Sequence, residues 1–487
     1  MQVLGQRPGP LLAAWVSCAA LAAALPALWM WRFTVDDALI AIRYARHLVA
    51  GFGWRFDAHG PSTDGVTPLP WPLLLAPLAL GQSAMGGDAL VVLGRAKVVG
   101  FVAWVIAAAM LGRAVGRSAA PSWARAAALG VLALSVPVAA HAVSGMETGV
   151  AMALATAAVL LGERPRTAAL VAGIAASLRP EMAPWALVLA VGFAVAGEGD
   201  RTRRAIEAGA LALAPFVGCA LVRAFAWGRP APLAVLAKPS DLAHGAAYAG
   251  AALVVTLAPL LACAPWALAR HPRGRAIAAA ALVHVAVIVV VGGDWMPYAR
   301  LMAPIAPSLV LAAVYAAERA HPASTAARSA AAVAVGVVLW ARAGAAGRDV
   351  GADRAALIAK ARPLLAGASR VAALDVGWVS AATEADIVDL AGLTDPEIAA
   401  LPGGHTSKRV GARFLLDRAP DVLLIYAPEG LPHEAQRGGL AAWRDVVTPR
   451  AVEARLLDDD LIGRHFEGSA WLPLGTKGAG YVLLRSR

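Results

Sequence analysis

The stretch Thr34-Val-Asp36-Asp37-Ala-Leu-Ile-Ala-Ile-Arg43-Tyr-Ala-Arg-His47 follows the first long apolar run of this chain. Two adjacent carboxylates stand where that run would leave a membrane, and the residues after them have the spacing of an amphipathic helix. In a helix that begins at Asp36, this residue shares one face with Arg43 and His47. The opposite, apolar face holds Ala38, Ile42, Ala45 and Val49. The stretch therefore predicts a helix that lies at a membrane surface.

Asp36 and Asp37 also allow a plainer interpretation. Aspartate at the start of a helix caps free backbone amides and interacts favourably with the helix dipole. On this interpretation the pair has no chemical role. The rest of the chain favours a chemical role instead, because it places further ionisable groups beside other apolar segments.

The composition indicates a membrane protein. Of the 487 residues, 59% are hydrophobic and only 15% are charged, and apolar runs of about twenty residues recur, the length that a spanning helix needs. We predict about eleven spans, at 11–31, 89–112, 122–141, 148–162, 167–180, 182–197, 204–227, 247–269, 276–292, 300–317 and 325–341. The apolar piece Val66–Gly81 holds four prolines, which would break an inserted helix, so we place it on the outer surface.

The cysteines bear on disulfide formation and metal binding, and the first apolar run bears on signal-peptide cleavage. Cys18, Cys219 and Cys263 all lie in apolar runs, so we expect neither a disulfide framework nor a thiolate metal site. The first run has no small-residue cleavage site before Trp29-Met-Trp-Arg32. We therefore predict an uncleaved first span and not a signal peptide.

The net charge of +11 is distributed unevenly. Residues 342–487 hold 18 basic and 18 acidic residues, whereas residues 1–341 hold 25 basic and 14 acidic residues. With a cytoplasmic N-terminus and eleven spans, the inner loops hold 14 bases and five acids, and the outer loops hold eight bases and nine acids. This pattern follows the positive-inside rule and argues against nucleic-acid binding. We expect a multi-pass protein of a bacterial inner membrane, with its C-terminal part extracytoplasmic.

The chain should form two domains. Residues 1–341 are predicted to be the transmembrane domain, with juxtamembrane helices on its outer face at about 36–81. Residues 342–487 are predicted to be a soluble extracytoplasmic α/β domain, because short buried strands alternate there with Ala- and Leu-rich helical stretches. The predicted strands are Arg370–Asp375, Asp386–Leu390, Pro420–Tyr426 and Gly480–Arg485.

Each predicted outer loop carries an ionisable residue beside the end of a span. In addition to Asp36, Asp37 and Arg43, these residues include Asp64, Glu147, Arg179, Glu181, Lys238, Asp241, His244, Asp294 and Arg300. A single such residue can be a snorkelling anchor. Ionisable groups in five loops on one side of a membrane indicate a shared cavity, since each of them is costly at lipid level.

Outward-facing acids beside basic residues at lipid level suit a sugar donor carried on a polyprenyl phosphate. We assign the basic residues Arg43, Lys238 and Arg300 to the donor phosphate, whose leaving charge they would stabilise. Asp36 or Asp37 would take the proton of an incoming hydroxyl. The further substrate-binding candidates are His47, Glu147, Arg179, Glu181, His244 and Asp294. No cofactor is required, and a divalent cation, if one is used, would bind Asp36 and Asp37.

These residues stand in motifs that resemble those of a known family. Asp36–Gly53 with Asp64-Gly-Val-Thr67-Pro-Leu-Pro-Trp71 resembles the first outer loop of polytopic GT-C glycosyltransferases, in particular the mycobacterial terminal arabinofuranosyltransferases and related bacterial membrane proteins. Further matches follow in the same order: Ser144–Thr148, Arg179–Glu181, Pro230–Lys238, Gly292–Pro297, Arg300 and Asp389–Asp395.

The resemblance implies a GT-C fold, a polyprenyl-phosphate sugar donor and an inverting transfer on the outer membrane face to a glycan, lipid or protein hydroxyl. It also implies that one of the two aspartates is the general base; the shared helical face favours Asp36. Two motifs depart from the family. Many relatives have a Glu-Gly-Tyr-Thr-like run where this chain has Asp64–Thr67, and a Pro-Asn-Thr run near Lys238 that this chain lacks. The donor sugar therefore stays open.

Two other classes of function stay open. A polytopic transporter or lipid flippase would also combine many spans with intramembrane charges, but transporters often contain two related halves, and this sequence shows none. A non-catalytic assembly subunit would use residues 342–487 as its binding module.

Overall fold

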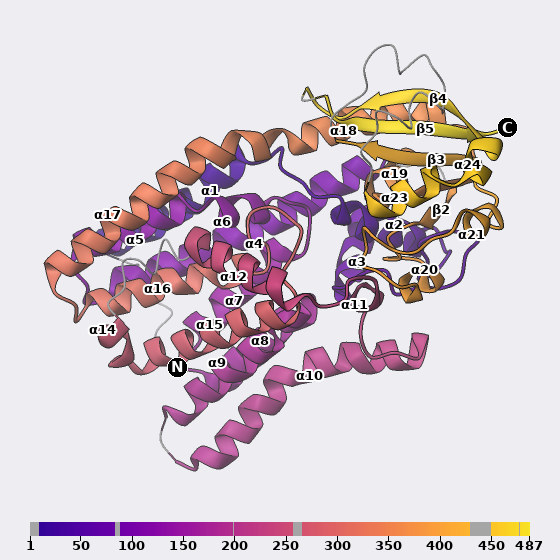
Figure 1. The fold of residues 1–487 in the computed structure, drawn as a ribbon. Coiled ribbons are helices and arrows are strands. Elements are labelled where there is room, and N and C mark those ends of the chain that lie inside the picture. Colours follow the sequence, from indigo (N-terminus) through magenta and orange to yellow (C-terminus); the bar gives the residue numbers. More distant parts are fainter. Residues whose placement is uncertain (1–8, 83–87, 198, 257–264, 429–449, 477) are drawn as a thin grey trace. The chain divides into compact units, whose positions relative to one another are not determined.

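The structure, a computed structural model, describes residues 9–82, 88–197, 199–256, 265–428, 450–476 and 478–487 (Figure 1). The chain divides into two compact units. The first, the helical unit, comprises Met1–Phe33, Ala96–Cys219 and Ser240–Arg348. The second, the sheet unit, comprises Thr34–Arg95, Ala220–Pro239 and Asp349–Arg487.

Apolar helices make up the helical unit. They are α1 (Pro10–Trp29), α4 (Ala89–Arg117), α5 (Ser122–Ala133), α6 (Val136–Ala142), α7 (Thr148–Leu160), α8 (Pro165–Leu178), α9 (Ala183–Val195), α10 (Arg201–Trp227), α12 (Leu242–Thr256), α14 (Pro265–Ala269), α15 (Pro272–Val290), α16 (Ala306–Ala317) and α17 (Pro322–Leu339). The short helices η2 (Pro180–Met182) and η3 (Ala303–Ile305) precede α9 and α16, and η4 (Trp340–Gly344) follows α17. Helices α4 and α10 each extend into the sheet unit.

Five helices of the described chain are long and apolar enough to cross a membrane: Pro10–Trp29, Ala89–Arg117, Arg201–Trp227, Pro272–Val290 and the continuous segment Pro322–Leu365. The pair α5 and α6, bent by 57°, would make a sixth. A helical protein with candidate membrane spans is thus supported, whereas eleven full spans are not shown. Four of the predicted spans are short helices in the structure, namely α7, α8, α9 and α16. Pro165 and Pro180 interrupt the apolar run that contains the first three. The predicted span 247–269 and Cys263 lie partly or wholly outside the described residues.

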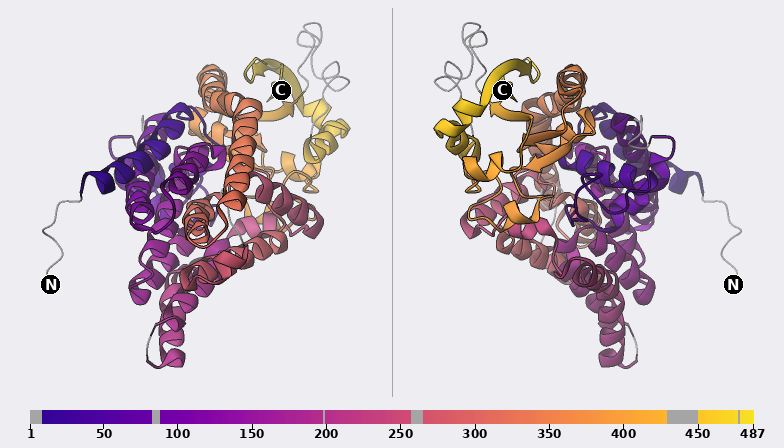
Figure 2. Two further views of the ribbon diagram at one scale, coloured as in Figure 1. Left: turned by 90° about the vertical axis from the view of Figure 1, so that its left-hand side faces the viewer. Right: turned by 90° about the vertical axis from the view of Figure 1, so that its right-hand side faces the viewer.

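Glycines let the helices of this unit pack closely. A Cβ atom at Gly100 of α4 would lie 2.7 Å from the carbonyl oxygen of Ala142, and one at Gly149 of α7 would lie 3.1 Å from the Cα of Gly100. Gly173 of α8 meets the backbone of Ala212 in α10 in the same way. Small residues at such crossings bring helix backbones together, as is typical of membrane helices. Figure 2 shows α9 and the first part of α10 running side by side.

The sheet unit contains a five-stranded mixed sheet of order β2-β1-β3-β5-β4. The strands are β1 (Arg370–Ala373), β2 (Asp386–Asp389), β3 (Val422–Ala427), β4 (Phe466–Pro473) and β5 (Gly480–Ser486). Strand β1 pairs in parallel with β2 and β3, and β5 is antiparallel to β3 and β4. The four predicted strands are confirmed. The edge strand β4 was not predicted, because Gly468 and Pro473 obscure its alternation and a register shift follows Gly468.

The sheet unit also contains helices from distant parts of the sequence. They are α2 (Asp37–Val49), α3 (Pro70–Leu75), η1 (Ala76–Ala79), α11 (Leu233–Ala237), α18 (Ala345–Leu365), α19 (Val376–Ala382), α20 (Pro396–Ala400), α21 (Ala412–Leu416), α23 (Ala451–Leu457) and α24 (Asp460–His465). The sheet unit thus includes 34–95 and 220–239 in addition to most of the predicted domain 342–487.

Helix α2 has the predicted residues but not the predicted surroundings. All ten residues from Ala38 to His47 are buried, so neither face of the helix is free. The structure therefore differs from an amphipathic helix with one free face, because the polar face of α2 packs against other parts of the sheet unit; its predicted place at a membrane surface stays a prediction. The physical reason lies in the partners of its polar side chains.

Candidate functional site

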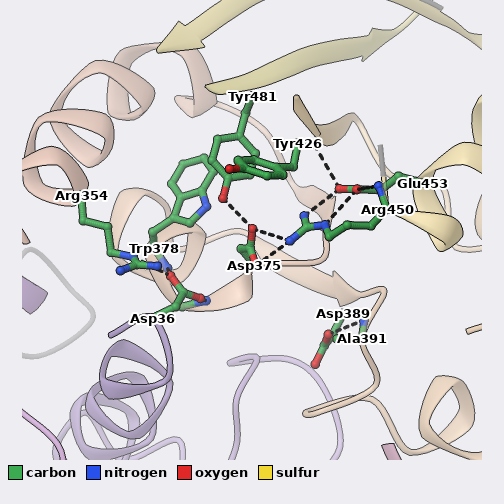
Figure 3. Close-up of polar contacts among 11 residues, drawn as sticks. Asp36, Arg354, Asp375, Trp378, Asp389, Ala391, Tyr426, Arg450, Glu453 and Tyr481 are labelled. Atoms are coloured by element: carbon green, nitrogen blue, oxygen red, sulfur yellow. Dashed lines mark hydrogen bonds and ion pairs between the residues drawn. The ribbon is translucent and has the colours of Figure 1, made fainter. Parts of the chain in front are cut away.

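The carboxylate of Asp36 does not cap its own helix. Although Asp36 is the N-cap residue of α2, its side chain makes no capping hydrogen bond there. Instead, its Oδ2 accepts a hydrogen bond from the backbone N–H of Gly377 at 2.8 Å, and its Oδ1 accepts one from the N–H of Trp378 at 2.9 Å. These amides belong to the first turn of α19. Arg354 of α18 adds an ion pair of 3.2 Å between its Nε and Oδ1 (Figure 3).

This arrangement makes Asp36 a structural link between three helices. Burial raises the pKa of its carboxyl to about 6, against the opposing effect of Arg354 and with a further increase from the nearby Asp375 and Asp37. Gly377 lets the two segments approach, because a Cβ atom there would collide with the backbone carbonyl of Asp36. Both oxygens of Asp36 are therefore occupied by donors from the sheet unit.

Asp37 differs from its neighbour. It stands in the first turn of α2 and is partly exposed. Within the described part of the chain, its carboxylate forms no hydrogen bond or ion pair. Of the two aspartates that the sequence offered as a general base, Asp37 is thus the one whose oxygens are available to a substrate.

A second polar cluster, here called the sheet-edge cluster, consists of Asp375, Arg450, Glu453 and Tyr481 (Figure 3). Nη1 of Arg450 lies 3.0 and 2.9 Å from the two oxygens of Asp375, and its Nη2 donates to Glu453 at 2.8 Å. The hydroxyl of Tyr481 donates to Asp375 at 2.5 Å. Burial and the charge of Asp375 raise the pKa of Tyr481 well above its usual value, against the opposing effect of Arg450, so Tyr481 keeps its proton.

The sheet-edge cluster lies at the switch point of the sheet. Asp375 follows β1, and Tyr426 stands near the end of β3. The guanidinium of Arg450 lies over the ring of Tyr426. In open α/β sheets, the crevice between two such strands is where ligands commonly bind. Trp378 connects this cluster to Asp36: its ring lies 4.9 Å from that of Tyr481, and its backbone N–H binds Asp36.

Arg43, predicted to bind phosphate, is 1% exposed and uses its donors within the protein. Its Nε donates to the carbonyl oxygen of Phe56 at 2.6 Å, and its Nη1 and Nη2 donate to those of Thr383 and Ala385 at 3.1 and 2.7 Å. Its Nη2 also pairs with Asp57 at 3.2 Å. Arg43 thus ties α2 to the segment that enters β2, and this network provides the partners of the polar face of α2.

His47 and Lys238 occupy different surroundings within the sheet unit. Nδ1 of the buried His47 lies 3.0 Å from the carbonyl oxygen of Arg55, and burial together with Arg43 lowers the pKa of this histidine to about 4. His47 is therefore neutral at neutral pH. Lys238 ends α11, is half-buried, and forms no side-chain hydrogen bond or ion pair with the described residues.

The helical unit contains the other predicted residues. We call Glu147, Arg179, Glu181, Asp294 and Arg300 the arginine cluster. Nη1 of Arg179 donates to Glu147 at 2.9 Å, and its Nη2 lies 2.6 Å from an oxygen of Glu181. Nε of Arg300 donates to Asp294 at 2.6 Å, and its Nη1 donates to the sulfur of Met146, the residue before Glu147, at 3.6 Å.

The arginine cluster is buried but incompletely satisfied. Glu147 and Arg179 have side chains that are 1% and 5% exposed. Nevertheless, Oε2 of Glu147 and Nε of Arg179 have no hydrogen-bond partner among the described residues. Buried polar atoms without partners are costly, so each of these two atoms is a place where a ligand or an ordered water would supply a hydrogen bond.

The loop that carries Asp294 and Arg300 is strained. Tyr298 and Ala299 have φ angles of 61° and 47°, a region that residues other than glycine seldom adopt. Such strain often accompanies a functional site. His244 lies against the same loop: its Nδ1 is 2.7 Å from the carbonyl oxygen of Gly292, and its ring stacks on the exposed Trp295 at 4.3 Å.

The structure therefore brings the predicted residues together in two groups. The helical unit gathers Glu147, Arg179, Glu181, His244, Asp294 and Arg300, and the sheet unit contains Asp36, Asp37, Arg43, His47 and Lys238. Among the described residues, no three His, Cys, Asp or Glu side chains gather in the manner of a metal site.

Sequence reasoning missed Arg354, Gly377, Trp378 and the sheet-edge cluster. One signal was present, because Asp375 ends the predicted strand Arg370–Asp375, and functional residues of α/β proteins often stand at the carboxyl ends of strands. The other partners had no signal in the sequence, since they come from helices that meet α2 only in the folded chain.

The fold and these clusters define a helical protein with candidate membrane spans and a mixed α/β sheet. Residues 352–471, about a quarter of the chain, match a family described as Domain of unknown function (DUF8728). No curated protein and no solved structure matches this chain.

Proposed function

We propose that this protein is a membrane glycosyltransferase that uses a polyprenyl-phosphate sugar as its donor. The observation that carries the proposal is the unequal state of two adjacent carboxylates. Asp36 is held by two backbone amides and by Arg354, whereas Asp37 has no partner among the described residues. Fixing the first carboxylate gives the second a defined position, which a general base requires.

In the proposed reaction, Asp37 accepts the proton of an acceptor hydroxyl. The hydroxyl oxygen then forms a bond to the anomeric carbon of the sugar, on the side opposite to the phosphate. The bond between that carbon and the phosphate oxygen breaks, and its electron pair leaves with the polyprenyl phosphate. The transfer therefore inverts the anomeric centre. The outer face of a bacterial inner membrane, predicted from the charge pattern, is the proposed place of reaction.

The arginine cluster, which lies within the helical unit, is proposed in its own right as a site for a phosphate group. Its two guanidinium groups pair with three carboxylates, so the charge of the cluster is already balanced. What the cluster offers is the buried Nε of Arg179, to which a phosphate oxygen would give the acceptor that it lacks. Glu147, Glu181 and Asp294 hold the two arginines in place. His244 and Trp295 provide a stacked, partly exposed surface that suits a sugar ring.

The test is transfer from a panel of radiolabelled polyprenyl-phosphate sugars to a cell-envelope glycan extract, with purified protein in lipid vesicles. Asp37→Asn should lower the turnover number by about 10²- to 10⁴-fold, the usual contribution of a general base, without a change in unfolding temperature. Asp36→Asn should lower stability and leave measurable transfer.

Equal activity of Asp37→Asn and wild type would refute the base assignment. Absence of transfer from every donor by folded wild-type protein would refute the transferase. A lipid-flux assay with the same vesicles then tests the transporter or flippase alternative.

A further inference from the structure

The helical unit also contains a hollow of about 330 Å³, at the opposite end of α8 from Arg179. It is bordered by the first turns of α8 and α10 and by the end of α9. Its lining includes Arg164, Arg166, Ala194, Arg204, Glu207 and Ala208. By the topology predicted from charge, this end faces the cytoplasm.

The charge of this hollow is positive after its internal pairs are counted. Arg166 and Arg203 both pair with Glu207, at 2.7 and 3.1 Å. Arg164 is exposed and has no side-chain partner among the described residues. The guanidinium of Arg204 donates to the carbonyl oxygen of Gly197, but its buried Nε has no acceptor in the described chain. Two helices begin here, but the carboxylate of Asp200 already accepts from the first free amides of α10, so the arginines and not the helix ends would hold an anion.

An apolar strip continues from the hollow along α8. Leu170 and Ile174 follow Arg166 at intervals of four residues, so all three lie on one face of the helix. Leu170 is 43% and Ile174 39% exposed. A molecule that presents an anion to the arginines would therefore place an attached hydrocarbon chain along this strip.

We propose that this hollow binds the headgroup of an anionic phospholipid of the inner leaflet. The phosphodiester would lie between Arg164 and Arg204 and supply the acceptor for the Nε of Arg204, and one acyl chain would lie on Leu170 and Ile174. This site is independent of the proposed transferase reaction. Basic pockets between helices on the cytoplasmic side are a general mode of lipid recognition.

The experiment titrates full-length protein in detergent with phosphatidylglycerol, phosphatidylcholine and the soluble headgroup glycerophosphoglycerol, with bound molecules counted by native mass spectrometry. Phosphatidylglycerol should bind more tightly than the other two. Arg164→Gln should weaken its binding about fivefold, which corresponds to about 1 kcal/mol for one arginine near a phosphate. Because Arg164 has no side-chain contact to lose, this variant should fold.

Glu207→Gln provides a change of opposite sign. It removes the acid that neutralises Arg166, so phosphatidylglycerol should bind about fivefold more tightly. Arg117→Gln, an exposed arginine at the end of α4 outside the hollow, is the matched control and should have no effect.

Three results would overturn the proposal. The first is equal binding of phosphatidylglycerol to wild type, Arg164→Gln and Glu207→Gln. The second is equal binding of phosphatidylglycerol and phosphatidylcholine to wild type. The third is binding of glycerophosphoglycerol as tight as that of phosphatidylglycerol. The last result would assign the hollow to a soluble phosphodiester.

Discussion

Two buried arginines of this protein, Arg43 and Arg179, are in opposite states. Arg43 in the sheet unit has protein acceptors at Nε, Nη1 and Nη2. One acceptor is Phe56, shortly after α2, and the others, Thr383 and Ala385, lie more than 300 residues further along the chain. Arg179 in the helical unit pairs with two carboxylates, but its Nε has no acceptor among the described residues. Both side chains are almost completely buried.

The difference separates a structural role from a binding role. A satisfied buried arginine stabilises the fold, because each of its hydrogen bonds offsets the cost of burying the charge. A buried donor without an acceptor costs free energy, and the proposed phosphate would remove that cost at Arg179. The same contrast holds between Asp36, which has three donors, and Asp37, which has none in the described chain.

Replacing Arg179 by lysine should have the largest effect. Lysine keeps the positive charge but lacks the planar fork, so it cannot engage two carboxylates and a phosphate together. We expect the KM for the lipid donor to rise about 100-fold, equivalent to about 2.7 kcal/mol. Because lysine also loses part of the buried pairing with Glu147 and Glu181, stability should fall too, and the KM is measured on the protein that remains folded. The measurement is a donor titration in the transfer assay. An unchanged KM would place the donor phosphate elsewhere.

The same replacement at Arg43 should leave the KM for the lipid donor unchanged and lower the stability of the fold. Arg43→Lys loses hydrogen bonds to several buried carbonyl oxygens, so the free energy of unfolding should fall by about 2–3 kcal/mol. The transfer activity that remains should scale with the fraction of folded protein. Thermal unfolding and limited proteolysis of the detergent-purified variant measure the first quantity. Full stability with a raised KM would return Arg43 to the phosphate-binding role predicted from the sequence.

Gly377→Ala tests the contact between α2 and α19. The added Cβ would collide with the carbonyl of Asp36, and both segments are held by hydrogen bonds, so neither shifts easily. Overpacking of this kind typically costs about 1–3 kcal/mol. Gly367→Ala is unsuitable as a control because the φ of Gly367 is 80°. Gly411→Ala, with open space around it, serves instead and should be close to neutral.

The pH dependence of stability tests the raised pKa of Asp36. In the folded protein this pKa is about 6, against an ordinary value of 3.8, so the folded state binds more protons than the unfolded state between these values. Stability should therefore fall as the pH rises from about 4 to about 6 and should then level off. Asp36→Asn should remove about 3 kcal/mol of this change, an order-of-magnitude value. A variant with the wild-type pH profile would contradict the assignment.

Much of the fold was predictable because it depends on local patterns. Apolar runs such as 11–31 and 276–292 predicted long helices, and four short apolar runs predicted β1, β2, β3 and β5, all of which the structure contains. The number of spans was not predictable to the same degree, because a run of apolar residues conceals the breaks at Pro165 and Pro180. The edge strand β4 was missed since an edge tolerates glycine and proline.

The candidate site was predictable only as a set of residues. The ordered polar residues beside apolar runs identified Glu147, Arg179, Asp294 and Arg300, which do meet in the helical unit. Their pairing was not predictable, because salt bridges such as that between Glu147 and Arg179 join separate helices. The face of α2 suggested Asp36 as the base, yet its oxygens are the ones that α19 and Arg354 occupy.

By itself, the sequence determined that this protein is largely helical, carries apolar segments of membrane-spanning length, has a basic excess in residues 1–341 and ends in an α/β sheet. Hydrophobic periodicity and charge decide these properties over a few neighbouring residues at a time. Only the tertiary structure decided which aspartate is engaged, that α2 is buried on all sides, and which arginine lacks an acceptor. Those states depend on partners such as Gly377, 341 residues from Asp36, and folding alone brings such groups within hydrogen-bonding distance.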